Sequence, residues 1–192
     1  MKYNRKSIRL KGYDYSQAGL YFVTICCQNR EQFFGEIDND GQLLLNESGK
    51  MIEKWFLELE NKFPDIECDE YVVMPNHFHC IVINTGITVG KVMPVGTVGT
   101  DLRVCPNTNN DVVDAILGEH VGSPLHRVVQ WFKTMTTNEY IRGVNTLGWK
   151  RFDGKLWQRN YWEHIIRNEQ SYVTISEYIK NNPANWNADK LK

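Results

Sequence analysis

Along the first third of the chain, the spacing of apolar residues predicts one strand and one helix. Residues 21–27 form a run of β-branched and aromatic side chains, which is typical of a strand. Between residues 46 and 63, apolar side chains recur every three or four positions and would share one face of a helix. Asn46 stands where the N-cap of this helix is expected.

A pair of strands is predicted next, and the link between them holds the most distinctive motif of the chain. Residues 66–74 and 78–83 both have strand character, and the Pro-Asn pair between them predicts a hairpin. Residues two apart in a strand point to the same face, so His77 and His79 are expected side by side. Two imidazoles on a rigid strand can hold a metal ion or a phosphate.

Three further segments predict two helices and a strand. Ser123 followed by Pro124 is typical of a helix start, with Ser123 as N-cap, and this helix is expected to end before a connection at 143–154. Residues 156–167 alternate imperfectly and are interpreted as a strand. Residues 171–182 predict a last helix, which the following proline ends.

The order of these elements predicts a single α+β domain over residues 1–192. Strands mixed with helices in this order favour a ferredoxin-like antiparallel sheet with the helices packed on one face. Residues 1–19 are polar and basic and are expected to form an arm over the surface. Residues 84–122 are rich in glycine and lack a persistent period, so they are interpreted as a mobile inserted loop.

Charge is balanced over the whole chain but not along it. The 192 residues include 22 basic and 23 acidic side chains. Acidic residues dominate between residues 35 and 70, whereas basic residues dominate between 127 and 159 and in the first eleven residues. A basic surface can hold a polyanion such as DNA, and an ordinary solvated face explains the same pattern equally well.

Cysteine usage and hydropathy point to the cytoplasm. The five cysteines form no C-x-x-C pair, so a disulfide framework is not expected and a reducing compartment fits best. No apolar run approaches the ~18 residues of a membrane span. We therefore expect a cytoplasmic protein without membrane contact, which would be associated with the nucleoid if it binds DNA.

The last predicted helix carries a second candidate for chemistry. Tyr178 and Asn182 are four positions apart and would lie on the same helix face. Helix and strand together could place His77, His79 and the Asn182 amide oxygen around one ion, with the Tyr178 hydroxyl adjacent. Such a ligand set leaves positions open for a phosphate and suits Mg²⁺ or Mn²⁺. A tyrosine activated there would form a covalent phosphotyrosine.

Several motifs in a fixed order resemble a known family. The sequence resembles the HUH single-tyrosine transposases of the insertion-sequence 200/605 (IS200-like) type, and most of all the REP-associated tyrosine transposases. The resemblance covers nearly the whole chain except residues 84–122, and the order and spacing make it specific where the H-x-H motif alone would be weak. The matching segments are residues 13–15, 21–25, 74–79, 132–133, 136–137, 156–161, 163–167 and 178–183.

The resemblance implies a role for each candidate residue. His77 and His79 would be the paired metal ligands, and Tyr178 the nucleophile. Asn182 stands where related transposases often have glutamine, a departure that leaves the third ligand less firmly assigned. The family cleaves single-stranded DNA near imperfect hairpins with magnesium or manganese, forming a 5′-phosphotyrosine and a free 3′-hydroxyl. Its members include monomers and dimers, so a homodimer is compatible with the resemblance.

Basic, aromatic and polar residues are the candidates for DNA contacts. Those in the arm and in the basic segment would contact phosphates, and aromatic rings would stack on unpaired bases. A solvated face or a place in the core fits the same residues. The candidates are Lys2, Arg5, Lys6, Arg9, Lys133, Arg142, Arg151, Trp157, Gln158 and Arg159.

Two other functions fit the same residues. A domesticated relative would bind hairpin DNA without strand transfer, and it would give only a salt-sensitive complex where the enzyme gives a covalent one. A zinc hydrolase would use His77, His79 and a third ligand such as His164, although the chain has no H-E-x-x-H motif and no cysteine cluster.

Overall fold

The computed structural model describes residues 10, 12–86, 122–189 and 191. Two short 3₁₀ turns, η1 (Gln28–Arg30) and η2 (Trp186–Ala188), accompany the main elements. The strands and helices, in chain order, are β1 (Gly19–Cys26), β2 (Gly35–Ile37), β3 (Leu43–Leu45), α1 (Glu47–Lys62), β4 (Ile66–Met74), β5 (His77–Asn84), α2 (Leu125–Leu147), β6 (Trp162–Ile166) and α3 (Glu169–Asn181).

The main sheet has the strand order β4-β5-β1-β6, and every neighbouring pair is antiparallel. In chain order these four strands are β1, β4, β5 and β6, with α1 between β1 and β4 and α2 between β5 and β6. This is the ferredoxin-like arrangement that the sequence predicted. The predicted hairpin is confirmed, since β4 and β5 pair closely on either side of the Pro-Asn link. The small β2–β3 hairpin was not anticipated from the sequence.

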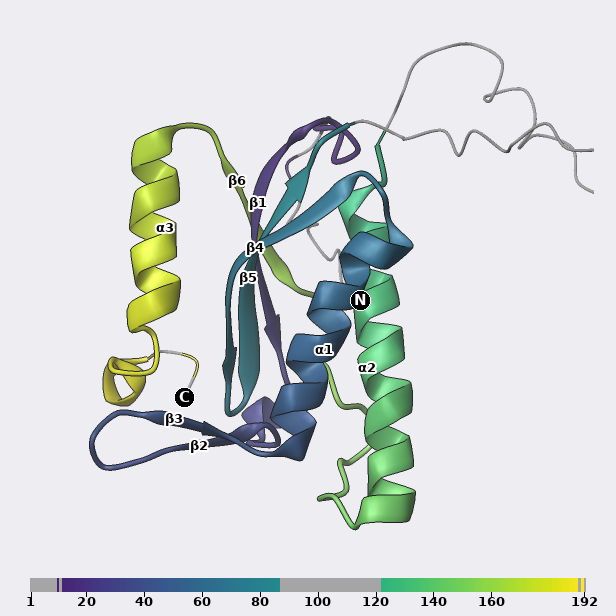
Figure 1. Ribbon diagram of the computed structural model, residues 1–192, viewed down its shortest axis with the longest axis vertical. Helices are drawn as coiled ribbons and strands as arrows, with labels where there is room; N and C mark the ends of the chain where they lie inside the picture. Colours follow the sequence, from purple (N-terminus) through teal and green to yellow (C-terminus); the bar gives the residue numbers. More distant parts are fainter. Residues whose placement is uncertain (1–9, 11, 87–121, 190, 192) are drawn as a thin grey trace, which may run out of the picture.

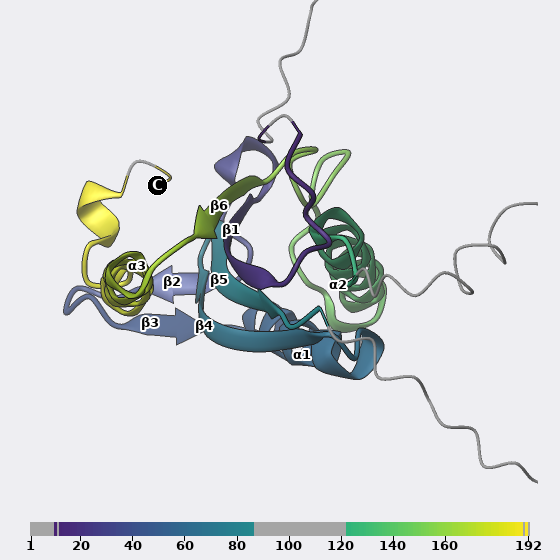
Figure 2. The ribbon, with the colours of Figure 1, turned by 90° about the horizontal axis from the view of Figure 1, so that it is seen from above.

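The helices cover both faces of the sheet. Helices α1 and α2 pack on one face, and α3 lies on the other (Figures 1 and 2). The expectation that all helices share one face is therefore wrong. Strand β5 explains the difference: Phe78 and Cys80 belong to the core under α1 and α2, whereas Ile81 belongs to a second core that includes Ile179 of α3. A strand covered on both faces shows a continuous apolar run, as β5 does after His79.

Helix boundaries agree with the sequence at α1 and differ at α2. The Asn46 side chain accepts a hydrogen bond from the backbone N–H of Gly49, which confirms the predicted N-cap. Ser123 is not the N-cap of α2, because Pro124 holds that position and the Ser123 hydroxyl donates to Asp65 Oδ1 at 2.8 Å. Helix α2 also extends into the connection predicted at 143–154 and ends at Leu147.

The glycine at position 143 lets α2 continue beneath an aromatic ring. The Trp149 indole folds back over the helix, and a Cβ added at Gly143 would overlap its ring atoms. We expect Gly143→Ala to lower the free energy of unfolding by about 1–3 kcal/mol through overpacking. Urea denaturation measures the change. Asn145→Ala, at an exposed position of the same helix, should stay within about 0.5 kcal/mol of the unmodified protein; equal effects would contradict this explanation.

The segment before α3 is less regular than the sequence suggested. Only Trp162–Ile166 of the predicted strand at 156–167 pairs with β1, and the residues before it are held by an isolated bridge between Cys27 and Trp157. Helix α3 begins after Asn168, which caps it, and ends close to the predicted boundary. Among the helices that the structure describes, none is long and apolar enough to span a bilayer.

Candidate active site

The two histidines of the H-x-H motif lie together at the start of β5, on the face that α3 covers. Their side chains are 0% and 1% exposed for His77 and His79, and their ring centroids are 4.6 Å apart. The strand geometry predicted this arrangement.

Hydrogen bonds fix which nitrogen of His77 carries the proton. The Asn76 amide nitrogen donates to the carbonyls of Arg30 (3.2 Å) and Leu191 (2.8 Å), so its oxygen Oδ1 must be the atom that lies 2.7 Å from His77 Nδ1. That oxygen accepts the Nδ1–H, which leaves Nε2 with a bare lone pair. Burial lowers the pKa of His77 to about 4, against the opposing charge of Asp189, and favours the neutral ring.

His79 connects the strand to the candidate nucleophile. Its Nδ1 lies 2.7 Å from the Thr24 hydroxyl, and its Nε2 lies 3.3 Å from the Tyr178 hydroxyl. The Phe22 ring stacks on the imidazole at a centroid distance of 5.3 Å and contacts Tyr178 edge-on. Burial also holds the pKa of His79 well below its ordinary value. A neutral imidazole with Nδ1–H directed at Thr24 has its Nε2 lone pair facing the Tyr178 hydroxyl.

Helix α3 and its C-cap place Tyr178 and Asn182 over the imidazoles of their own chain. Tyr178 is 44% exposed, so its hydroxyl is at the boundary between the site and solvent. Burial, and next the charge of Asp189, raise the pKa of Tyr178, so the phenol is the resting form. Asn182 is 2% exposed, and its Oδ1 makes no hydrogen bond with any residue that the structure describes.

Asp189, in the segment after α3, is a member of this site that the sequence did not reveal. Its Oδ2 lies 3.5 Å from His77 Nε2, and its side chain is 6% exposed. Its Oδ1 accepts a hydrogen bond of 2.7 Å from the backbone N–H of Leu191. The Trp186 ring, three residues earlier, stacks on His77 at 6.1 Å. An isolated acid in a polar segment without periodicity gives no signal in the sequence.

The polar atoms left over in this site fit a hard divalent cation. His77 Nε2, Asn182 Oδ1 and Asp189 Oδ2 are all buried and lack hydrogen-bond partners within the described part of the chain. One nitrogen and two oxygens are donors that Mg²⁺ and Mn²⁺ accept. Within residues 12–86 and 122–189, no three His, Cys, Asp or Glu side chains form a metal-binding group, so an ion there would need the amide oxygen.

The third zinc ligand that the sequence left open is not supplied by His164. It lies opposite Phe22 in the β1–β6 register and is exposed, and the Phe22 ring stacks directly on His79. The described residues therefore give no support to the zinc hydrolase alternative, which needs three soft or borderline ligands at short range.

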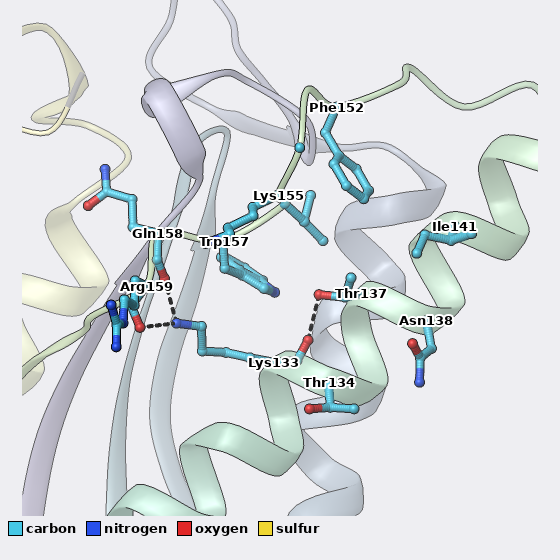
Figure 3. A pocket seen from close by; sticks show the side chains of 12 residues that line it. Lys133, Thr134, Thr137, Asn138, Ile141, Phe152, Lys155, Trp157, Gln158 and Arg159 are labelled. Carbon is cyan, nitrogen blue, oxygen red and sulfur yellow. Dashed lines mark hydrogen bonds between the residues drawn. The ribbon is translucent and has the colours of Figure 1, made fainter.

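A cleft beside α2 collects part of the predicted DNA-binding set. It has a volume of about 390 Å³ and lies between α2 and the loop at 152–159. Figure 3 shows Phe152 and Ile141 at one end and Gln158 and Arg159 at the other. Arg159 and the unpredicted Lys155 are exposed, so the cleft combines apolar walls with cations.

Two residues expected to contact DNA make structural contacts within the protein. Trp157 is 4% exposed, and its indole N–H donates to Thr136 Oγ1 at 2.9 Å, so it belongs to the core and has no free ring face for a base. The Lys133 ammonium donates to the carbonyls of Gln158 (2.6 Å) and Arg159 (3.2 Å). Burial lowers the pKa of Lys133 to about 8. These contacts attach the loop to α2.

The remaining candidates lie elsewhere. Arg142 pairs with Glu139 at 2.9 Å and lines a groove between α1 and α2, away from the cleft. Arg151 is exposed in the connection after α2. Four candidates from the N-terminal arm lie outside the described residues, namely Lys2, Arg5, Lys6 and Arg9. Most of the predicted loop at 84–122 also lies outside them.

Comparisons with known proteins agree with this fold. No protein-family model matches the chain. A solved REP-associated tyrosine transposase, bound to a REP hairpin, matches with a TM-score of 0.50 at 20% identity over 93% of this chain and 73% of that chain. The chain thus has the fold of the REP-associated tyrosine transposases, as its motifs predicted.

A relative with a higher sequence identity shows the family to which the chain belongs. An uncharacterized protein of Haemophilus influenzae is 38% identical over 193 residues, which cover 98% of this chain and 93% of that protein. The chain belongs to one family with that protein. A solved protein of Deinococcus radiodurans R1 matches more distantly, with a TM-score of 0.45 and 15% identity over 90% of this chain and 95% of its own.

Proposed function

We propose that this protein is a metal-dependent single-stranded DNA transposase and endonuclease that cleaves and rejoins DNA at hairpin-bearing ends. The observation that carries the proposal is the 3.3 Å distance between the Tyr178 hydroxyl and His79 Nε2, beside the bare nitrogen of His77. A nucleophile, a pair of neutral imidazoles and an amide oxygen converge within one chain. A homodimer is therefore not needed to complete the site.

The proposed reaction exchanges one phosphodiester for another. The Tyr178 oxygen attacks the phosphorus, a bond forms between them, and the bond from phosphorus to the 3′-oxygen breaks. The phenol gives up its proton and the leaving 3′-oxygen gains one, so charge and atoms balance. The products are a 5′-phosphotyrosine and a free 3′-hydroxyl, and attack by another 3′-hydroxyl reverses the step and rejoins the strands.

His77, His79 and Asn182 would hold the divalent ion, Mg²⁺ or Mn²⁺. When bound, the ion would polarise a phosphate oxygen and stabilise the charge that develops in transfer. The chain's own contribution is to fix the ligands: Asn76 holds the His77 proton on Nδ1, and Thr24 is placed to do so for His79. The raised pKa of Tyr178 means that the phenol needs a nearby cation to react at neutral pH.

The cleft beside α2 is proposed to guide the DNA strand toward this site. The backbone N–H of Gln158 donates to the Cys26 carbonyl at 2.9 Å, and Cys26 is paired with His77 in the sheet. The cleft and the histidines therefore lie at the same end of the sheet. A DNA strand whose phosphates contact Arg159 is then close to the catalytic groups. The proposed place of action is the cytoplasm, on the nucleoid.

Arg159→Gln is expected to weaken binding of hairpin DNA and to lower the salt slope of log K by about one, the value for one lost phosphate contact. Fluorescence anisotropy at several salt concentrations measures both quantities. Arg142→Gln removes the same charge from the groove between α1 and α2 and should leave the slope unchanged. If the two variants behave alike, the cleft is not the DNA path.

A covalent-attachment assay tests the proposed function as a whole. The protein is incubated with Mn²⁺ and a single-stranded oligonucleotide that carries an imperfect hairpin, and the products are separated on a denaturing gel. A protein–DNA adduct that survives denaturation supports strand transfer through tyrosine. A complex that forms only under native conditions and dissociates in salt would instead show a hairpin-binding protein without strand transfer.

A further inference from the structure

Two hydrogen-bond acceptors face each other in the buried part of the site. The Asn76 oxygen accepts the Nδ1–H of His77, so in the neutral ring His77 Nε2 is the nitrogen with the free lone pair. The atom opposite is Asp189 Oδ2, 3.5 Å away, and neither atom has a hydrogen-bond partner among the described residues. A nitrogen lone pair and a carboxylate oxygen in a desolvated space are unfavourable unless a positive charge, either a ring proton or a metal ion, lies between them.

Hydrogen bonds hold the Asp189 carboxylate in place. Its other oxygen accepts the Leu191 N–H at 2.7 Å, and the Leu191 carbonyl accepts the Asn76 amide at 2.8 Å. Asn76 thereby orients His77 directly and Asp189 through the backbone of Leu191. A group that orients two facing donor atoms is what the outer shell of a metal site provides.

We propose that Asp189 is a ligand of the divalent ion, supplied by the segment after α3 and placed beside His77. The inference rests on the proposed function, which supplies the ion, and adds a carboxylate to His77 and Asn182, the two proposed ligands whose buried atoms also lack partners among the described residues. Neighbouring ligand atoms around one octahedral Mg²⁺ or Mn²⁺ lie about 3 Å apart, close to the 3.5 Å found here. A carboxylate turns a neutral ligand set into an anionic one, which hard divalent ions prefer.

The test measures Mn²⁺ binding by the full chain without DNA, from the loss of the electron paramagnetic resonance signal of free Mn²⁺. Asp189→Asn keeps an oxygen for the Leu191 N–H and directs an amide N–H at His77 Nε2, so the facing acceptors become a hydrogen bond. We expect Mn²⁺ affinity to fall at least about tenfold, as for lost metal-site groups. Asp40→Asn, in the exposed β2–β3 turn, removes the same charge and should change nothing.

Thermal melting shows that the variant is folded and gives an independent readout. Without metal, Asp189→Asn should melt at or above the temperature of the unmodified protein, because a repulsion is removed. Added Mn²⁺ should raise the melting temperature of the unmodified protein and fail to raise that of the variant. Variant and unmodified protein stabilised equally by Mn²⁺ would overturn the inference.

Other outcomes separate this inference from the proposed function. If Asp189→Asn binds Mn²⁺ normally and cleaves DNA faster, the carboxylate obstructs the site and is not a ligand. If the unmodified protein binds no Mn²⁺, the metal-dependent function and the inference fail together. If it binds Mn²⁺ and forms the DNA adduct while Asp189→Asn does both equally well, only the inference fails.

Discussion

Tyr178→Phe is expected to abolish covalent attachment to DNA and to leave DNA binding intact. The substitution removes one oxygen, the atom that forms the bond to phosphorus, and no other group can replace a missing nucleophile at the same position. We expect adduct formation to fall at least about a thousandfold, the scale seen when a nucleophile is deleted. The measurement is the amount of labelled oligonucleotide that stays attached to the protein on a denaturing gel, with Mn²⁺ present.

The structure explains why this variant should remain folded. The Tyr178 ring contacts the edges of Phe22 and His79, and phenylalanine preserves both contacts. The hydroxyl contact with His79 at 3.3 Å and the interaction with the Asn182 side chain are lost, at a residue that is 44% exposed. Tyr172→Phe, on the same helix, is the matched control and should keep full adduct formation. An adduct formed by Tyr178→Phe would show that the nucleophile is a different residue.

Local periodicity was sufficient to place most of the candidate site. A spacing of two in a strand put His77 and His79 on one face, and a spacing of four in a helix aligned Tyr178 with Asn182. What periodicity cannot state is the face of the sheet on which a helix packs, and here α3 covers the face opposite α1 and α2. The buried run of β5 indicates two covered faces, although it does not say which helix covers which.

Residues whose role depends on long-range contacts were not predictable. Trp157 and Lys133 looked like DNA contacts because of their residue types, yet an indole bonded to Thr136 and an ammonium bonded to two carbonyls serve the fold. Asp189 was missed for the opposite reason, because no local pattern marks it and only the return of the chain after α3 brings it to His77. Sequence periodicity describes elements, whereas these three roles arise between elements.

The double variant His77→Ala/His79→Ala is expected to lose metal-dependent cleavage, by at least about a hundredfold. Both imidazoles leave the site, so the ion loses two proposed ligands and the Tyr178 hydroxyl loses its neighbour His79 Nε2. Cleavage of the hairpin oligonucleotide is measured as a function of Mn²⁺ concentration.

Because both rings are buried and hydrogen-bonded, their removal also costs stability, and circular dichroism must show that the double variant is folded at the assay temperature. The informative control is His164→Ala, which removes an exposed imidazole from the same sheet face without touching either ring nitrogen of the pair. The proposed site requires full activity from His164→Ala and none from the folded double variant. Cleavage that survives in the double variant would show that the pair does not take part in the chemistry. Loss of cleavage in His164→Ala would restore the zinc alternative, since a third imidazole would then be essential.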